Sequence, residues 1–125
     1  ERVLRAMDNP YVDIIGHPTG RIIGRRDPLP LDMEAIMAKA AETGTAMELN
    51  AYPDRLDLND VHLRLAKEHG VRIAIDCDAH RVEHMNYMRY GIAMARRGWI
   101  TREECLNAQP LPVLRSWLKR AARTS

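Results

Sequence analysis

Three side chains with metal-ligand chemistry follow apolar segments of this chain. Asp78 and His80 come shortly after the apolar run 71–75, and His17 comes shortly after the apolar segment 11–15. An aspartate and a histidine two residues apart in extended chain point to the same side. A carboxylate with imidazoles suits a divalent cation such as Mn²⁺, Zn²⁺ or Fe²⁺. The spacing therefore predicts that these side chains share one metal-binding rim.

Each of these motifs also has a purely structural interpretation. An aspartate next to a histidine is found where a helix cap adjoins a partly buried histidine, and a lone histidine before a proline is commonly structural. The functional interpretation is favoured because two separate segments end in ligand-type residues, and the carboxyl ends of parallel strands collect active sites. Asn50 is predicted either to orient a ligand or bound phosphate or to cap the following turn. His84, four residues after His80, is predicted to face the same rim.

Basic residues gather in clusters although the net charge is small. The formal charge of +2 does not indicate a nucleic-acid partner by itself, but local patches bind phosphates. Arg21, Arg25 and Arg26 follow His17 in the loop 18–30, which is rich in proline and glycine. Two interpretations stay open for these arginines: contact with a substrate phosphate, or a solvated charged loop.

The composition is that of an ordinary globular chain. Its 125 residues are 46% hydrophobic and 29% charged, which is enough for one domain or part of one. No apolar run approaches the ~20 residues that span a bilayer, and no basic-then-apolar signal opens the chain. Cys77 and Cys105 match neither a disulfide framework nor a zinc pattern. We therefore expect a cytoplasmic protein with reduced thiols and no membrane contact.

The elements that must position these residues alternate between strands and helices. Short strands are predicted over 11–15, 45–50 and 71–75. Two helices are predicted between them over 32–44 and 59–70, each with a polar cap residue at its start and a glycine at its end. This order predicts an α/β fold in which parallel strands are joined by right-handed crossovers.

The remainder of the chain is predicted to be mainly helical. A helix over 82–97 is expected to be interrupted or kinked near Gly91 and to end at Gly98. Its apolar positions are Met85, Met88, Ile92 and Ala95. The methionines of this helix are expected to fill the core rather than to bind a cofactor.

Shorter helices are expected near both ends of the chain. Residues 1–7 resemble the end of a helix, and the absence of an initial methionine suggests a trimmed or partial chain. Thr101 and Glu104 form a capping-box pattern that predicts a short helix, and Pro112 suits the first turn of a last helix.

Several ordered motifs together resemble one known family. They occupy residues 12–21, 48–51, 53–58, 78–80, 89–91 and 95–99. In content and order they resemble the PHP (polymerase and histidinol phosphatase) domain of bacterial and archaeal family X DNA polymerases. The resemblance extends over essentially the whole chain.

The family resemblance implies a fold, an activity and a set of site residues. The fold is a distorted (β/α)₇ barrel whose rim holds up to three divalent metal ions, Mn²⁺ or Zn²⁺. The activity is phosphoesterase action, including 3′-5′ exonuclease removal of nucleotides from DNA 3′ ends. The resemblance implies metal ligation by His17, Asp78 and His80. It places three further residues near the substrate: Arg21, Asn50 and His84.

The resemblance covers only the second half of such a barrel. Residues 1–125 are accordingly predicted to be a partial PHP domain with a helical C-terminus, without the opening His-x-His strand or the polymerase portion. Asp76 and Cys77 also differ from the small polar residues expected there. The chain is therefore expected to be inactive alone, to reach DNA through a parent protein, and to associate with the missing half or a second copy.

Two other functions stay open at this stage. One is a stand-alone PHP phosphatase that acts on a small phosphomonoester. The other is a non-catalytic scaffold or interaction module that retains only the half-barrel. The segment 96–99 and the C-terminal helix resemble the polymerase-linked form better than the stand-alone phosphatase.

Overall fold

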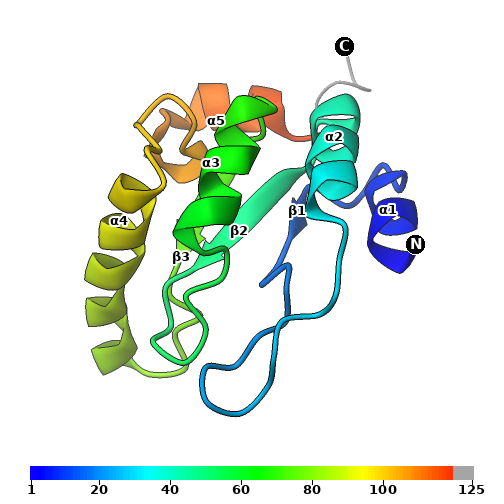
Figure 1. Cartoon of the computed structure of the whole chain (residues 1–125). Helices are drawn as coiled ribbons and strands as arrows, with labels where there is room; N and C mark the ends of the chain where they lie inside the picture. The colour runs from blue at the N-terminus through cyan, green and yellow to red at the C-terminus, as the bar shows by residue number, and fades with distance from the viewer. Residues whose placement is uncertain (120–125) are drawn as a thin grey trace.

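A three-stranded parallel sheet with helices forms the fold of residues 1–119, the part of the chain that this computed structural model describes (Figure 1). The elements are α1 (Arg2–Met7), β1 (Ile14–Ile15), α2 (Met33–Thr43), β2 (Ala46–Asn50), α3 (Asp60–Glu68), β3 (Ile73–Asp76), the 3₁₀ segment η1 (Val82–Tyr87), α4 (Met88–Arg97), the 3₁₀ turn η2 (Leu106–Ala108) and α5 (Leu111–Trp117). The predicted parallel α/β fold is confirmed. The seven-stranded barrel and the partial-domain bounds, which include residues outside the described range, stay predictions.

Strand β2 lies at the centre of the sheet and pairs in parallel with both neighbours. Ile14 of β1 lies opposite Ala46, and at the far end of β2 Asn50 lies opposite Asp76 of β3. Parallel pairing places the carboxyl ends of all strands at one edge. Among residues 1–119, no helix has both the length and the apolar character needed to cross a membrane.

Strand β1 is shorter than the predicted strand over 11–15. Asn9 holds the start of this segment in a turn: its carbonyl oxygen accepts the Val12 N–H at 3.1 Å, and its side-chain Oδ1 accepts the Tyr11 N–H at 2.9 Å. These bonds to Asn9 leave only Ile14 and Ile15 to pair with β2.

The two crossover helices begin and end as their sequences predict. The Asp32 side chain accepts the Ala35 N–H at 3.0 Å, and the Asn59 side chain accepts the His62 N–H at 2.9 Å. Both bonds satisfy N–H groups that the first helical turn leaves without a partner. Gly44 ends α2 in the left-handed conformation at φ 67°.

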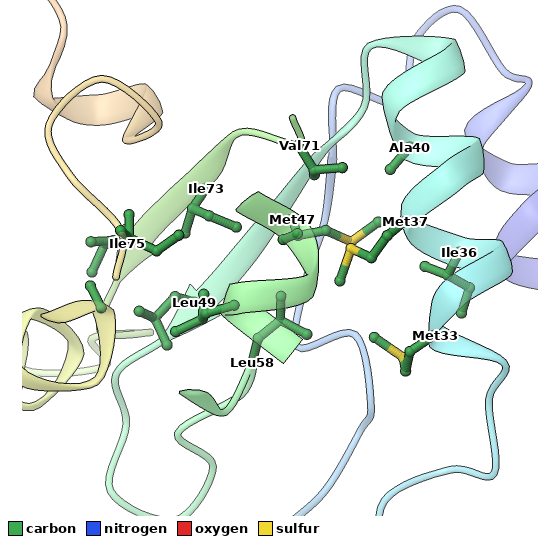
Figure 2. Close-up of a cluster of buried hydrophobic side chains, with 14 of the residues drawn as sticks. Met33, Ile36, Met37, Ala40, Met47, Leu49, Leu58, Val71, Ile73 and Ile75 are labelled. Carbon is green, nitrogen blue, oxygen red and sulfur yellow. The ribbon is translucent and has the colours of Figure 1, made fainter. Parts of the chain in front are cut away.

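One face of the sheet carries the main core. Side chains alternate along a strand, so Met47 and Leu49 of β2 point to the same side as Ile73 and Ile75 of β3. All four are buried against side chains of α2 and α3. Figure 2 shows the α2 side chains reaching toward the sheet. On the opposite face, Ala46 and Ala74 pack with Leu106, Leu114 and Trp117.

The predicted helix over 82–97 is in fact two elements, and the break is not at Gly91. A 3₁₀ segment ends at Tyr87, and α4 runs unbroken through Gly91. A 3₁₀ segment has three residues per turn, so its side chains fall out of phase with those of α4. Of the predicted apolar positions, Ala95 is buried and Met88 packs against the core. The prediction is wrong for Met85 and Ile92, which are 59% and 45% exposed.

The predicted helix after Thr101 does not form, although its capping contacts do. The Thr101 N–H and hydroxyl donate to Glu104 Oε2 at 2.7 and 2.6 Å. The Glu104 carbonyl oxygen, however, accepts the Ile73 N–H at 2.9 Å, and Cys105 forms a parallel bridge with Ile73. Pairing with β3 therefore replaces a helical turn.

The outer edge of β3 is also covered by a side chain that makes the two backbone hydrogen bonds a neighbouring strand would make. The Asn107 amide accepts the Ile75 N–H at 3.0 Å through Oδ1 and donates to the Ile75 carbonyl at 2.7 Å through Nδ2. Strand β3 consequently has its edge groups occupied at Ile73 and Ile75. Such occupied edges do not accept a further strand.

Candidate active site at the carboxyl ends of the strands

The segments that follow the three strands lie at the same end of the molecule. Figure 1 shows the loops after β1, β2 and β3 extending past the sheet on one side, opposite the end where η2 and α5 pack. His17, Asn50 and Asp78 stand at or just beyond the ends of these strands. The fold therefore brings the predicted site residues to one edge of the sheet.

His17 follows β1 in an unusual backbone conformation. Its φ angle is +26°, and Asp78 after β3 has φ +50°, so both predicted ligands occupy a region that non-glycine residues seldom adopt. The His17 backbone N–H donates to Oε2 of Glu48 on β2. The His17 side chain is exposed.

Two carboxyl groups from neighbouring strands lie together beside His17. The carboxyl group of Glu48 on β2 lies beside that of Asp76, the last residue of β3. Burial, the hydrogen bond to Asp76 and the negative charges of Asp76 and Asp78 raise the pKa of Glu48 to about 7, although the His17 N–H opposes this rise. A carboxyl group with such a pKa can carry a proton near neutral pH.

Asp78 is held by two bonds at the end of β3. Its backbone N–H donates to Asp76 Oδ1 at 3.1 Å, and its Oδ2 accepts the Asn50 side-chain amide at 3.3 Å. Asn50 is fully buried, and its Oδ1 accepts the Tyr52 N–H at 3.0 Å. Asn50 is therefore bonded both to Asp78 and to the turn that follows β2. Its role in orienting a ligand or phosphate stays a prediction.

The histidines after Asp78 form a connected pair. His80 Nδ1 donates to the Asp78 carbonyl oxygen at 2.6 Å, because a carbonyl can only accept. This bond leaves Nε2 of a neutral His80 with a free lone pair. The His80 backbone N–H donates to Nδ1 of His84 at 3.2 Å, and the His84 side chain is buried. His80 thus has a ring nitrogen free to act as a ligand, and the buried His84 holds the His80 backbone in place.

A cleft of about 400 Å³ opens over these residues. Its walls are formed by Ile22, Arg25, Tyr52, Asp54, Arg55, Asp78, His80, Arg81 and His84. The structure therefore brings Asp78, His80 and His84 together in one cleft. Neither His17 nor Arg21 is among its lining residues. The His17 backbone is bonded to Glu48, which lies beside Asp76.

The Arg21 guanidinium contacts the chain itself. Its Nε donates to the Arg55 carbonyl oxygen at 2.7 Å, and its Nη2 donates to the Leu56 carbonyl. In return, Arg55 Nη1 donates to the Arg21 carbonyl at 3.2 Å. These bonds fasten the loop after β1 to the loop after β2. Contact of Arg21 with a substrate stays a prediction.

The carboxylate of Asp57 provides a second fastening between the same loops. Asp57 is fully buried, and its Oδ2 accepts the N–H groups of Thr19 and Gly20 at 3.0 and 3.1 Å. Its Oδ1 has no hydrogen-bond partner among the described residues. The loop that begins at His17 is therefore held in place by hydrogen bonds to a buried carboxylate.

A complete metal site is not assembled by residues 1–119. Within that range, no three His, Cys, Asp or Glu side chains are placed to hold one ion together. His17, Asp78 and His80 have the donor atoms that Mn²⁺ or Zn²⁺ accept. His17 is linked to the Asp78–His80 segment indirectly, by way of Glu48 and Asp76. Their role as ligands stays a prediction that needs further ligands.

Three acidic residues of this region were not predicted from the sequence. Glu48 stands two residues before Asn50, so the alternation of side chains along a strand is a signal that places both on one face. Asp76 lies at the strand end itself. Asp57 has no comparable local signal, because its partners lie 37 and 38 residues away.

Comparisons with known proteins find two classes of relative, an exonuclease and several phosphatases. The chain is 45% identical over 120 residues to the DNA polymerase/3′-5′ exonuclease PolX of Bacillus subtilis, covering 96% of this chain and 21% of that protein. It is 30% identical over 127 residues to a probable phosphatase of Thermoanaerobacter sp., covering 97% of this chain and 49% of the relative. A probable phosphatase of Caldanaerobacter subterraneus is 36% identical over 84 residues, covering 62% of this chain and 31% of the relative. No family model matches the chain.

The likeness to PolX extends over nearly all of this chain but only part of the relative. The chain spans about a fifth of the PolX protein and about half of the Thermoanaerobacter phosphatase. The chain is therefore related to part of PolX, and this supports the coarser part of the family resemblance. Exonucleases and phosphatases both cleave phosphate esters, so the names of the two classes agree on that chemistry.

Proposed function

We propose that this chain is part of a phosphoesterase unit in a PolX-type DNA-processing protein, and that the unit removes nucleotides from DNA 3′ ends. The observation that carries the proposal is the cleft at the strand ends, where Asp78, His80 and His84 come together. The 45% identity to part of the B. subtilis PolX exonuclease supports it. Residues at the carboxyl ends of parallel strands are those expected to do chemistry.

Each residue of the cleft has a role in this proposal. Asn50 and the Asp76 carboxyl group hold Asp78 in place, and the bond from His80 to the Asp78 carbonyl directs Nε2 of His80 away from the backbone. Glu48, whose pKa is raised to about 7, is protonated in part of the molecules near neutral pH, and this limits the repulsion between it and Asp76. These contacts keep the cleft in one arrangement before a substrate enters.

The proposal includes a divalent metal ion, Mn²⁺ or Zn²⁺, held in part by this chain. His17, Asp78 and His80 would supply some of its ligands, and the others would come from outside the described residues, which do not complete a site. We expect the purified chain to retain no stoichiometric metal after gel filtration, as measured by elemental analysis. One tightly bound ion per chain would contradict this expectation.

A further part of the proposal concerns what lies beside β1. The sheet order leaves β1 at one edge, and Ile14 of this strand is 40% exposed. Because the β3 edge is occupied at Ile73 and Ile75, we propose that a strand from the rest of the parent protein, or from a second copy, pairs at β1. Light scattering that shows a stable monomer at high concentration would exclude the second copy.

A nuclease assay on the chain alone tests its dependence on a parent protein. With Mn²⁺ and a 3′-labelled oligonucleotide, we expect no measurable turnover. Turnover comparable to that of B. subtilis PolX would show that the chain needs no other part.

A chimera tests whether the residues can do the proposed chemistry. The matching region of B. subtilis PolX, which is 45% identical over 120 residues, is replaced by this chain. We expect the chimera to retain 3′-5′ exonuclease activity and Asp78→Asn or His80→Ala to reduce it at least about 100-fold. Polymerase activity serves as the folding control. A chimera that polymerises but does not degrade DNA would refute the proposal.

The likeness to the probable phosphatases favours a second candidate, a phosphatase for small phosphomonoesters. The same chimera separates the two when it is offered an oligonucleotide and p-nitrophenyl phosphate at equal concentration. Preference for the oligonucleotide supports the exonuclease. Preference for the small ester supports the phosphatase. Activity on neither would favour a non-catalytic scaffold.

A further inference from the structure

Three arginines from three separate segments line the candidate cleft. Arg25 comes from the loop after β1, Arg55 from the loop after β2, and Arg81 from the residue before η1. They surround the two residues, Asp78 and His80, that the proposed function places at the reaction centre. Convergence of guanidinium groups from distant parts of a chain creates a local positive potential.

None of these arginines is neutralised by an ion pair. Among residues 1–119, the acidic groups within salt-bridge distance of a basic side chain pair with Lys39, Lys67, His69 or Arg97 instead. Two carboxylates, Asp54 and Asp78, also line the cleft, and Asp78 is already bonded to Asn50. Three guanidinium groups against two carboxylates leave the walls with a positive balance that suits an anion.

The loops that carry two of the arginines are fastened to each other. The Ile23 N–H donates to the Asp54 carbonyl at 2.6 Å, and Arg21 donates to the Arg55 carbonyl at 2.7 Å. The turn that presents Arg25 is closed by the bond from the Arg26 N–H to the Ile22 carbonyl at 2.8 Å. Arg21 therefore holds this wall together, whereas the exposed Arg25 side chain has no hydrogen bond or ion pair within residues 1–119.

Aromatic rings line the cleft together with the arginines. Tyr52 lies edge-on to His84 with ring centroids 5.3 Å apart and edge-on to Tyr87 at 5.2 Å, while His84 stacks on Tyr87. Tyr52 and His84 both reach the cleft. Flat apolar rings beside guanidinium groups are the combination that binds single-stranded nucleic acid, in which bases and phosphates alternate.

The size of the cleft also exceeds what a single phosphate needs. Pockets of about 300–1,000 Å³ enclose whole small molecules, and this cleft measures about 400 Å³. A nucleotide with its flanking phosphates fits such a space better than an isolated phosphate group. The distribution of the arginines over separate loops likewise suits several phosphates rather than one.

We propose that Arg25, Arg55 and Arg81 bind successive phosphates of a single-stranded DNA segment whose terminal ester lies at Asp78 and His80. This inference rests on the proposed function and adds to it: the arginines select a polynucleotide over a small phosphomonoester. Phosphate contact falls to these three arginines rather than to Arg21.

Binding measurements on the 125-residue chain test this assignment. A fluorescently labelled six-nucleotide single-stranded DNA is titrated by anisotropy, with Arg25→Ala, Arg81→Ala and the double variant. We expect each single variant to weaken binding about 3-fold to 5-fold, and the double variant to weaken it about 10-fold or more. The salt dependence of log K should fall by about 1.4 for the double variant, since each phosphate contact on single strands contributes about 0.7.

Matched controls exclude a general effect of charge or folding. Arg5→Ala removes the same charge from an exposed site on α1 and should leave binding within about 2-fold. Arg25→Lys keeps the charge and should retain most of the affinity. Unchanged thermal midpoints show that the variants are folded. Tripolyphosphate, a phosphate chain without bases, should compete poorly.

Every other outcome overturns the assignment. The assignment is refuted if the wild-type chain does not bind the oligonucleotide. It is also refuted if Arg5→Ala lowers the affinity as much as Arg25→Ala, or if tripolyphosphate binds as tightly as the oligonucleotide. The chimera distinguishes the two proposals. If it degrades DNA while the double variant binds normally, only this inference fails. If it is inactive while the double variant binds weakly, only the proposed function fails.

Discussion

The side-chain amide of Asn50 donates to Oδ2 of Asp78 at 3.3 Å and thereby joins the carboxyl end of β2 to the segment after β3. The same buried side chain accepts the Tyr52 N–H at 3.0 Å. One residue thus sets both the course of the loop after β2 and the direction of the Asp78 carboxylate. A buried amide with both ends bonded has little freedom to rearrange.

Asn50→Asp is expected to destabilise the chain more than Asn50→Ala. The alanine variant loses two hydrogen bonds and leaves the Tyr52 N–H without its acceptor, at a cost of about 1–3 kcal/mol. The aspartate variant places a second buried carboxylate against Asp78, at a cost of about 3–5 kcal/mol near neutral pH. Urea denaturation measures both. The exposed Asn86→Ala is the control, and equal stability of Asn50→Asp and wild type would contradict the prediction.

Asp57→Ala is expected to release the loop that follows His17. Two backbone N–H groups, of Thr19 and Gly20, lose their buried acceptor, which costs about 2–4 kcal/mol. The loop contains several arginines, so limited trypsin digestion should cut there faster, and mass spectrometry of the fragments checks this.

A control for the Asp57 variant lies in the same loop. Asp27→Ala removes an exposed carboxylate and should leave the cleavage rate and the stability almost unchanged. Slow cleavage of Asp57→Ala, at the wild-type rate, would show that the Arg21 contacts hold the loop by themselves.

The elements that local chemistry specifies are those that the sequence predicted well. Asp32 and Asn59 cap their helices through bonds three residues away, and Gly44 ends a helix by its own conformation. Strand–helix alternation likewise predicted the parallel sheet. The spacing of Asp78, His80 and His84 was enough to predict that they lie near one another, because they are close together in the chain, and all three line one cleft.

Features that depend on distant partners were not accessible to the same reasoning. Arg21 turns toward the carbonyl groups of Arg55 and Leu56, more than 30 residues further along the chain. The raised pKa of Glu48 depends on the register that sets it beside Asp76. The kink predicted at Gly91 is absent for a similar reason, since this glycine is required by close packing against Ala51 and Ile75 rather than by a bend.

Adding a methyl group at either glycine of the α4 region is expected to destabilise the fold. A Cβ at Gly98 would lie 2.4 Å from Leu63 Cβ, and one at Gly91 would lie 2.7 Å from Ala51 Cβ and 2.9 Å from Ile75 Cγ2. Gly98→Ala and Gly91→Ala should each cost about 1–3 kcal/mol, because the helix must move away from its neighbours. Thermal and urea denaturation measure the loss.

The control for the glycine variants is the exposed Ala93 of the same helix. Ala93→Ser should change the stability by less than about 0.5 kcal/mol. If Gly91→Ala were instead more stable than wild type, as the higher helix propensity of alanine alone predicts, α4 would not pack as closely on β3 as the structure has it.

Glu104 gives the chain a stability term that is lost in acid. Partial burial alone would raise the pKa of this carboxyl group, but hydrogen bonds from Lys67 and Thr101 outweigh it and lower the pKa to about 2. A carboxyl group with a depressed folded-state pKa stabilises the fold above its unfolded pKa of ~4.5 and loses that contribution as the pH falls toward 2. Glu104→Gln should therefore cost about 1 kcal/mol at pH 7, allowing for solvent around Lys67, and almost nothing near pH 2.

Urea denaturation at several pH values measures this difference, and Glu103→Gln, next to it and exposed, should show no such dependence. A gap between wild type and Glu104→Gln that stays constant from pH 7 to pH 2 would mean that packing, not charge, accounts for the contribution of Glu104.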